Sequence, residues 1–217
     1  MKLDILSHDL RSVDTEHAIS VLRKYLEVME AQMEEVHRCE RVVLDGERPE
    51  TDDEEDYQVF LQEKQALDEL FERDLAPAMR YSFIVLTHTV FETRLRAFCS
   101  EMQRDLKIPV LVTEIRGSPI DQARTYLTKL ARLGVANFPE WNELRNIQIV
   151  RECIVHVYGF VAVSGEPKAL RQLVNQNAGL TIDDNGRLVL SKSFCDEYLS
   201  CLARFFERLF RAAGWKR

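Results

Sequence analysis

Apolar residues recur along residues 15–44 with the spacing of a long helix that buries one narrow face. They stand at intervals of four, three, four, three and seven residues: Leu22, Leu26, Met29, Met33, Val36 and Val43. This heptad spacing predicts a continuous helix with a single apolar seam, for which Thr15 is a candidate N-cap. We expect the seam to pack on the rest of this chain or on the same helix of a second copy.

Later segments show the same periodicity, separated by short breaks. We expect helices over residues 57–74, 77–105, 119–133, 139–159, 168–175 and 193–211, with Pro77 and Pro119 near two of the starts and Gly134 at one end. Residues 183–186, Asp-Asp-Asn-Gly, form a turn signal between two short apolar strands. The fold class predicted is all-α, an up-and-down helical bundle with one small β-hairpin.

Residues 45–56 are the clearest linker, because Gly46 and Pro49 precede an acidic run. The run lacks the alternating carboxylates and central glycine of a calcium loop. A chain of 217 residues with 46% hydrophobic content fits one well-cored domain. We therefore expect a single domain over residues 1–217, with an N-terminal helix at 15–44, an acidic linker at 45–56 and a bundle core at 57–212 that contains the helix at 139–159.

Several patterns bear on compartment and cofactors. The chain has no apolar run of about 18 residues and no signal-peptide pattern, which predicts a cytoplasmic protein without a membrane partner. Its five cysteines are odd in number and form no C-x-x-C pair, as expected of reduced thiols. Because metal-ligand spacings and glycine-rich phosphate loops are also missing from the sequence, we expect no metal and no other cofactor.

Charge is divided unevenly along the chain. Residues 1–75 hold 9 Lys/Arg and 22 Asp/Glu, a net −13, whereas residues 76–217 hold 20 and 14, a net +6. A basic region is typical of proteins that bind polyanions, although net charges of this size are also common in proteins that do not. One hypothesis is that the acidic residues 1–56 fold back over the basic part as an inhibitor.

Arg151 and His156 are the most informative pair. On the helix predicted at 139–159, seven residues fall on one broad apolar arc: Trp141, Leu144, Ile147, Ile154, Val155, Val157 and Tyr158. Arg151 projects into the middle of that arc, where a permanent charge is costly without partners. Such an arginine has a structural explanation too, because it can extend its guanidinium to the rim or pair with one carboxylate.

The other histidines have simpler interpretations. His88 stands four residues before Glu92, which puts both on one face of a helix and favours a structural hydrogen bond. His8, His17 and His37 lie in the acidic N-terminal part, and we expect them to be solvated.

The segment Arg151-Glu-Cys-Ile-Val-His156 resembles the Arg-x4-6-His signature of the HEPN superfamily of helical proteins. An apolar helix carrying Glu92, the predicted hairpin and the closing helix follow the same order as in that family, so the resemblance covers roughly residues 57–212. Many members carry Asn or Asp after the arginine, where this chain has Glu152. The resemblance implies a metal-independent endoribonuclease, acting on RNA in a prokaryotic toxin–antitoxin or defence system, and a homodimer that brings two motifs into one cleft.

Elementary chemistry is compatible with that activity. Histidine exchanges protons near neutral pH, arginine offers a planar fork to a phosphate, and RNA supplies its own 2′-hydroxyl nucleophile. We assign His156 as general acid or base and Arg151 as the phosphate clamp. Supporting roles fall to Glu152, four residues before His156, and to Glu92, a candidate partner of Arg151; Asn146 and Tyr158 are peripheral candidates.

Two other functions remain open. Some superfamily members have lost catalysis, so the chain can instead be a non-catalytic helical module for binding or dimerisation. It can also be a plain scaffold that dimerises through the 15–44 seam. A small antitoxin protein is a further partner that the resemblance implies.

Overall fold

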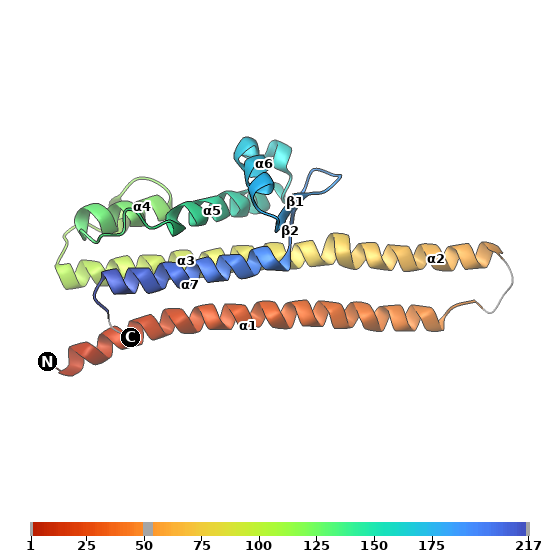
Figure 1. Cartoon of the computed structure of the whole chain (residues 1–217), viewed down its shortest axis with the longest axis horizontal. Helices are drawn as coiled ribbons and strands as arrows, with labels where there is room; N and C mark the ends of the chain where they lie inside the picture. Colours follow the sequence, from red (N-terminus) through yellow and green to blue (C-terminus); the bar gives the residue numbers. More distant parts are fainter. Residues whose placement is uncertain (1, 50–53, 216–217) are drawn as a thin grey trace.

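The computed structural model describes residues 2–49 and 54–215, which form three layers (Figure 1). Helix α1 (Lys2–Gly46) makes one outer layer, and α3 (Ala76–Leu106) with α7 (Lys192–Ala212) makes the middle. The other outer layer holds α4 (Pro119–Thr125), α5 (Glu140–Val157) and α6 (Pro167–Gln176). Strands β1 (Leu180–Ile182) and β2 (Leu188–Leu190) pair antiparallel beside them. The all-α bundle with one small hairpin is therefore confirmed.

Aromatic side chains fill the interface between the middle layer and α5. Phe205 of α7 lies with its ring centroid 4.7 Å from Trp141 of α5 and 5.9 Å from Phe91 of α3. All three are nearly inaccessible to solvent. From the other side, Ile19 and Leu22 of α1 join the same cluster of buried residues. The apolar faces of the three layers thus share one core, which sets the position of α5.

Helix α1 begins at Lys2 and not at residue 15, and it ends at Gly46. Thr15 lies inside the helix and is 5% exposed, so it is not an N-cap. The predicted linker at 45–56 is also too long, because α2 (Glu54–Glu69) starts within it; residues 50–53 lie outside the described part. The acidic side chains at 54–56 favour that start because they lie at the positive end of the α2 dipole.

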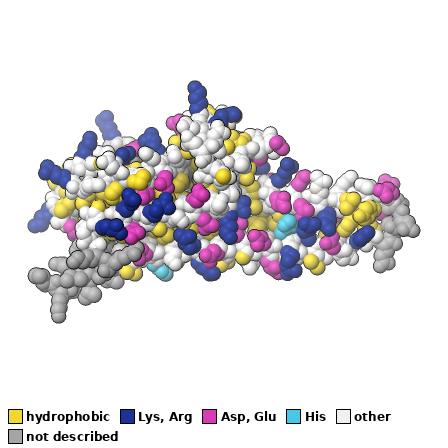
Figure 2. Space-filling model, viewed as in Figure 1, with side chains coloured by type: hydrophobic (Ala, Val, Ile, Leu, Met, Phe, Trp, Pro, Cys, Tyr) yellow, Lys and Arg dark blue, Asp and Glu magenta, His cyan; other side chains and the backbone are white. Residues whose placement is uncertain are grey.

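The predicted seam of α1 is buried only along its first half. Leu22 and Leu26 are 5% and 0% exposed, whereas Val36 and Val43 are 46% and 59% exposed. The reason is that residues 31–46 extend past the layers and lie beside α2 and the segment that follows it (Figures 1 and 2). We call residues 31–46 and 54–70 the arm.

Two polar contacts fix α1 and the arm. Arg80 of α3 donates two hydrogen bonds of 2.8 Å to the carboxylate of Glu30, and a third of 3.1 Å to the Leu190 carbonyl of β2. His37 lies 2.8 Å from Asp68 and stacks on Phe71, with 20% of its side chain exposed. The expectation that His37 is solvated was wrong, because α2 covers it.

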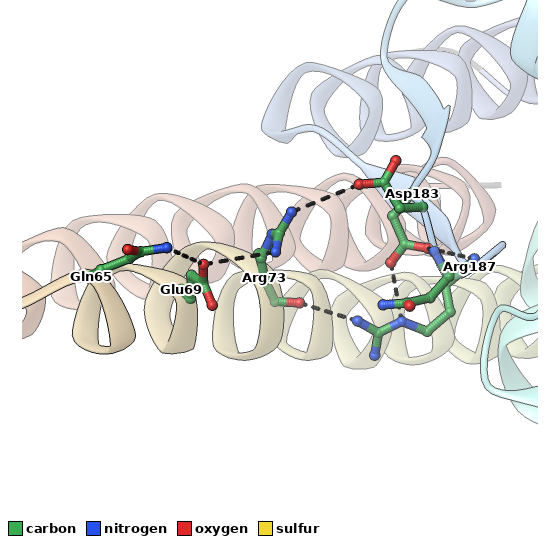
Figure 3. Close-up of polar contacts among 7 residues, drawn as sticks. Gln65, Glu69, Arg73, Asp183 and Arg187 are labelled. Atoms are coloured by element: carbon green, nitrogen blue, oxygen red, sulfur yellow. Dashed lines mark hydrogen bonds and ion pairs between the residues drawn. The ribbon is translucent and has the colours of Figure 1, made fainter. Parts of the chain in front are cut away.

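Helices α2 and α3 run into one another through a π-helical segment, Leu70–Leu75, where the sequence predicts a break. The backbone N–H of Ala76 donates to the Phe71 carbonyl, five residues back. Pro77 has no N–H for the Arg73 carbonyl, and Arg187 of the hairpin turn donates to that carbonyl at 3.5 Å (Figure 3). A side chain distant in sequence thus takes the place of the missing helical hydrogen bond.

The hairpin also holds the end of α5. Asp183 caps the turn, since its carboxylate accepts from the backbone N–H groups of Asn185 and Arg187 at 3.0 and 2.8 Å. Beyond α5, the Leu188 N–H donates to the Gly159 carbonyl at 2.9 Å, and the Val161 N–H donates to Gly186 at 3.0 Å. The segment after the motif helix is therefore attached to β2 and its turn.

Two predicted helix ends differ from the structure. The helix expected over 119–133 turns π-helical at Tyr126–Leu130, and Arg132, not Gly134, takes the left-handed conformation with φ 54°. The motif helix ends at Val157, because Tyr158 and Gly159 have φ of 51° and 82°.

Gly159 is required by its surroundings as well as by its backbone. A methyl group there would overlap the Tyr81 hydroxyl and lie 2.8 Å from the ring carbon that carries it. That hydroxyl donates to the Leu188 carbonyl, so the ring is not free to move aside.

We expect Gly159→Ala to lower the free energy of unfolding by about 2–4 kcal/mol, because it adds overlap to an unfavourable φ. Gly165→Ala is the control, since nothing lies within 4 Å of the added methyl, and its effect should stay within about 0.5 kcal/mol. Urea denaturation measures both. Equal effects at the two positions would contradict the close packing of Tyr81 on Gly159.

Candidate functional site

The buried face of α5 differs in part from the predicted arc. Trp141, Leu144, Ile147 and Ile154 are buried as expected, and Val150 and Cys153 complete the face. Val155 and Tyr158, which were placed on the arc, are 45% and 54% exposed. Arg151, which the sequence predicts in the middle of the apolar arc, is half-buried, and its Nε is buried.

Arg151 occupies a position between α3 and α7. Its charge acts on Glu92 of α3 and on Tyr198 of α7. Its Nε is buried and has no hydrogen-bond partner among the described residues. Leaving such a donor unpaired costs about 1–3 kcal/mol, and unpaired buried groups often coincide with functional sites.

His88 is the centre of the polar contacts beneath Arg151. It is 1% exposed, its Nδ1 lies 2.9 Å from the Tyr198 hydroxyl, and its Nε2 lies 3.3 Å from the Glu92 carboxylate. The predicted structural hydrogen bond of His88 is thus confirmed. The His88 imidazole, together with the charges of Arg151 and Arg96, holds the pKa of Glu92 below its usual range, while burial acts in the opposite direction.

Glu92 was predicted as a partner of Arg151. The structure brings the two close enough to interact electrostatically, but within the described residues Arg151 forms no ion pair, and the close partner of Glu92 is His88. Burial of the Tyr198 hydroxyl raises its pKa well above the ordinary value, so the tyrosine stays neutral and serves as a hydrogen-bonding group.

His156 lies outside this cluster. It is exposed in the last turn of α5 and has no side-chain hydrogen bond or ion pair with any described residue. Glu152, expected to orient it, instead accepts a hydrogen bond of 2.9 Å from Gln148. Within one chain, the structure therefore places Arg151 with Glu92 and does not place His156 against either of them.

The peripheral candidates fall on two sides of α5. Asn146 lines a cavity of about 110 Å³ between α5, α6 and α7, together with Tyr198 and Cys201. Tyr158 packs edge-on against Tyr81, with ring centroids 5.8 Å apart. Asn146 is thus part of a cavity lining, whereas Tyr158 lies two residues from His156.

Exposed apolar side chains stand close to His156 in the sequence, and of these only Val155 and Tyr158 were singled out by the sequence, as part of the apolar arc. Val155, Tyr158, Phe160 and Val163 are between 40% and 70% exposed, and Leu86 of α3 is 42% exposed. We call these five residues the motif surface. Because Tyr81 of α3 touches both Tyr158 and Gly159, α3 runs alongside this end of α5. An apolar surface around a polar pair is typical of an interaction site.

Surface charge differs between the two outer layers. Lys and Arg side chains project from the side formed by α4, α5 and α6, while side chains of both signs are mixed along α1 (Figure 2).

The cysteines and possible metal ligands offer no further site. The cysteines are unpaired, and burial raises the pKa of Cys99 and of Cys195 to about 12, which leaves these two thiols unreactive. In the described part of the chain, no group of three or more His, Cys, Asp or Glu side chains is placed to hold a metal ion.

Comparisons with protein-family models, with curated proteins and with solved structures find no match to this chain. The resemblance to the HEPN superfamily therefore rests on the residues themselves. None of the helices in the described ranges is long and apolar enough to span a membrane.

The lowered pKa of Glu92 predicts a pH dependence of stability. Folding favours the charged form of Glu92. The contribution of this carboxylate to stability is therefore present above the ordinary pKa of a glutamate, and it is lost as the pH falls through the lower pKa of the folded state. We expect the difference in unfolding free energy between wild type and Glu92→Gln to be constant near neutrality and to shrink below about pH 4. Denaturant titrations across pH measure it, with the exposed Glu34→Gln as control. A difference that is independent of pH would contradict the assignment.

Proposed function

We propose that the chain is a metal-independent endoribonuclease of the HEPN type, with Arg151 and His156 as its catalytic residues. The observation that carries the proposal is the pair itself, about 1.4 turns apart on one helix: an exposed imidazole and a half-buried guanidinium whose Nε is unpaired, neither hydrogen-bonded through these groups to any described residue. Packing of Tyr81 on Gly159 fixes the end of that helix, so the pair is held on a rigid element.

In this mechanism His156 takes the proton from a ribose 2′-hydroxyl, whose oxygen then attacks the adjacent phosphorus. Arg151 stabilises the charge that gathers on the phosphoryl oxygens. The bond to the 5′-oxygen breaks, and that oxygen receives a proton from an imidazolium, leaving a cyclic 2′,3′-phosphate and a 5′-hydroxyl. Atoms and protons balance without a further reactant.

A second copy would complete the site. Residues 151 and 156 point about 140° apart on a helix, so a single chain does not direct both at one phosphate. The motif surface around His156 supports pairing of two chains there, which would set the His156 of one beside the Arg151 of the other. The HEPN resemblance supports the same arrangement. It also suggests a cytoplasmic prokaryotic toxin or defence effector that is controlled by an antitoxin protein.

The alternative is a non-catalytic helical binding or dimerisation module. It is favoured by the position of Arg151, whose charge acts on Glu92 and Tyr198 and so has a structural use. On that view, removal of the guanidinium would weaken the fold and change no RNA-directed activity.

We expect purified wild type to cleave single-stranded RNA in the presence of a chelator, and Arg151→Ala and His156→Ala each to lose about 100-fold or more. Arg145→Ala and His17→Ala, at exposed positions outside the motif, are matched controls that should keep full activity. Circular dichroism checks that the variants fold. Undiminished cleavage in the motif variants would show a contaminating nuclease, and an inert wild type would favour the binding module.

Pairing through the motif surface has its own test. We expect Val155→Asp to convert a dimer into a monomer in analytical ultracentrifugation and to abolish cleavage with the fold intact, because it sets a charge in an apolar contact. Val21→Asp is the control, a valine of similar exposure on α1. A wild type that is monomeric at micromolar concentration, or a variant that stays dimeric, would refute the shared site.

A further inference from the structure

The arm carries an apolar groove that lies apart from the motif helix. A space of about 400 Å³ opens between α1 and the helix that follows the linker, with Val43 and Leu44 on one side and Leu67 and Leu70 on the other. Val43 and Leu70 are 59% and 46% exposed, so their side chains remain in contact with solvent. Exposed aliphatic side chains that converge on one groove are typical of a docking site.

Three glutamates, Glu40, Glu47 and Glu63, also line this groove. None of them forms a side-chain hydrogen bond or ion pair with another described residue. Positions 40 and 47 follow the same row of α1 as Val43, which places their carboxylates along the edge of the apolar strip. The groove therefore has an apolar floor and an acidic rim.

The cations of the arm are engaged elsewhere. Lys64 lies 2.6 Å from Asp45, and Arg41 lies 3.3 Å from Asp68. On a helical projection these ion pairs fall on the other side of the contact between the two helices. The rim glutamates are thus left without neutralising charge, which concentrates negative potential over the groove.

We propose that this groove binds an amphipathic helix of another protein, with an apolar stripe flanked by lysine or arginine. Glu40 and Glu47 are seven residues apart, so two turns of helix, about 10 Å, separate them along the groove. A ligand helix with aliphatic anchors at i, i+3 or i+4, and i+7 matches that length. Its flanking cations would meet the rim carboxylates, which fixes the orientation and excludes ligands with acidic flanks.

The charge of the groove argues against other occupants. RNA and anionic lipid surfaces are repelled by unpaired carboxylates. Two copies of the chain related by a two-fold axis would bring the same glutamates face to face, which disfavours self-association here. The groove is also separate from the proposed ribonuclease site, because the arm extends beyond the layers that contain α5 (Figure 1).

The test uses the full chain and two labelled peptides of about 18 residues, helical, with the same leucine stripe. One peptide carries lysine beside the stripe, and the other carries glutamate. Fluorescence anisotropy at low salt measures binding. We expect saturable binding of the lysine peptide, at least about 10-fold tighter than binding of the glutamate peptide, and weaker at higher salt.

Variants make the test specific for the groove. Combined Glu40→Lys, Glu47→Lys and Glu63→Lys should reverse the preference in favour of the glutamate peptide. The control combines Glu34→Lys, Glu54→Lys and Glu72→Lys, three exposed positions outside the groove with the same change in net charge. It should leave the preference unchanged. Val43→Ser with Leu70→Ser should weaken binding of the lysine peptide about 10-fold.

Each of the other outcomes overturns the proposal. Equal binding of the two peptides would show attraction to apolar surface alone. Loss of preference in the control as well as in the groove variant would show a net-charge effect without a site. A wild type that self-associates, and becomes monomeric with Val43→Ser and Leu70→Ser, would mean that a second copy occupies the groove. None of these experiments measures RNA cleavage, so the ribonuclease proposal can fail without affecting this result.

Discussion

The packing of Tyr81 on Gly159 is the contact on which the rest of the site depends. The Tyr81 hydroxyl donates a hydrogen bond to the Leu188 carbonyl, so one side chain of α3 holds together the end of α5 and a strand of the hairpin. Any other residue at 159 would have to displace that ring while adopting a φ of 82°. The end of α5, whose last turn carries His156, is therefore positioned by long-range packing.

A second long-range contact ties the π-helical segment Leu70–Leu75 to the same hairpin. Arg187 donates to the Arg73 carbonyl that Pro77 leaves without a helical partner, and it pairs with Asp183 at 3.2 Å in the turn (Figure 3). The π-helical segment, the turn and the strand that receives Tyr81 thus form one connected set of contacts. A ligand on the arm that altered the π-helical segment would act on the hairpin first, because Arg187 is shared between them.

Local patterns predicted most of the fold and less of the site. Helical periodicity and the turn signal at 183–186 sufficed for the all-α bundle and the hairpin, and the i, i+4 spacing sufficed for His88 and Glu92. The π-helical segment did not follow from sequence patterns, nor did the hydrogen bond that its Arg73 carbonyl accepts from Arg187, over 100 residues away. The burial of Val155 and Tyr158 was predicted wrongly, since the covered arc of α5 is defined only when its neighbours are known. Val155 and Tyr158 are apolar, yet α3 and α7 leave them exposed.

The acidic helix α1 does not cover the basic side of α4 and α5, as the inhibitor hypothesis requires, because it lies on the opposite side of the middle layer. Ile19 and Leu22 of α1 are buried against the middle layer, on the side opposite to α5, so residues 1–56 cannot be removed without exposing the core. Part of the negative charge of the described residues lies on the arm, whose α1 portion alone extends about 24 Å past the layers. Because salt screens exposed charges beyond about 8 Å, the arm does not oppose a polyanion at the basic side of α4 and α5. A cationic helix on the arm and a phosphate backbone at α5 could therefore be bound at the same time.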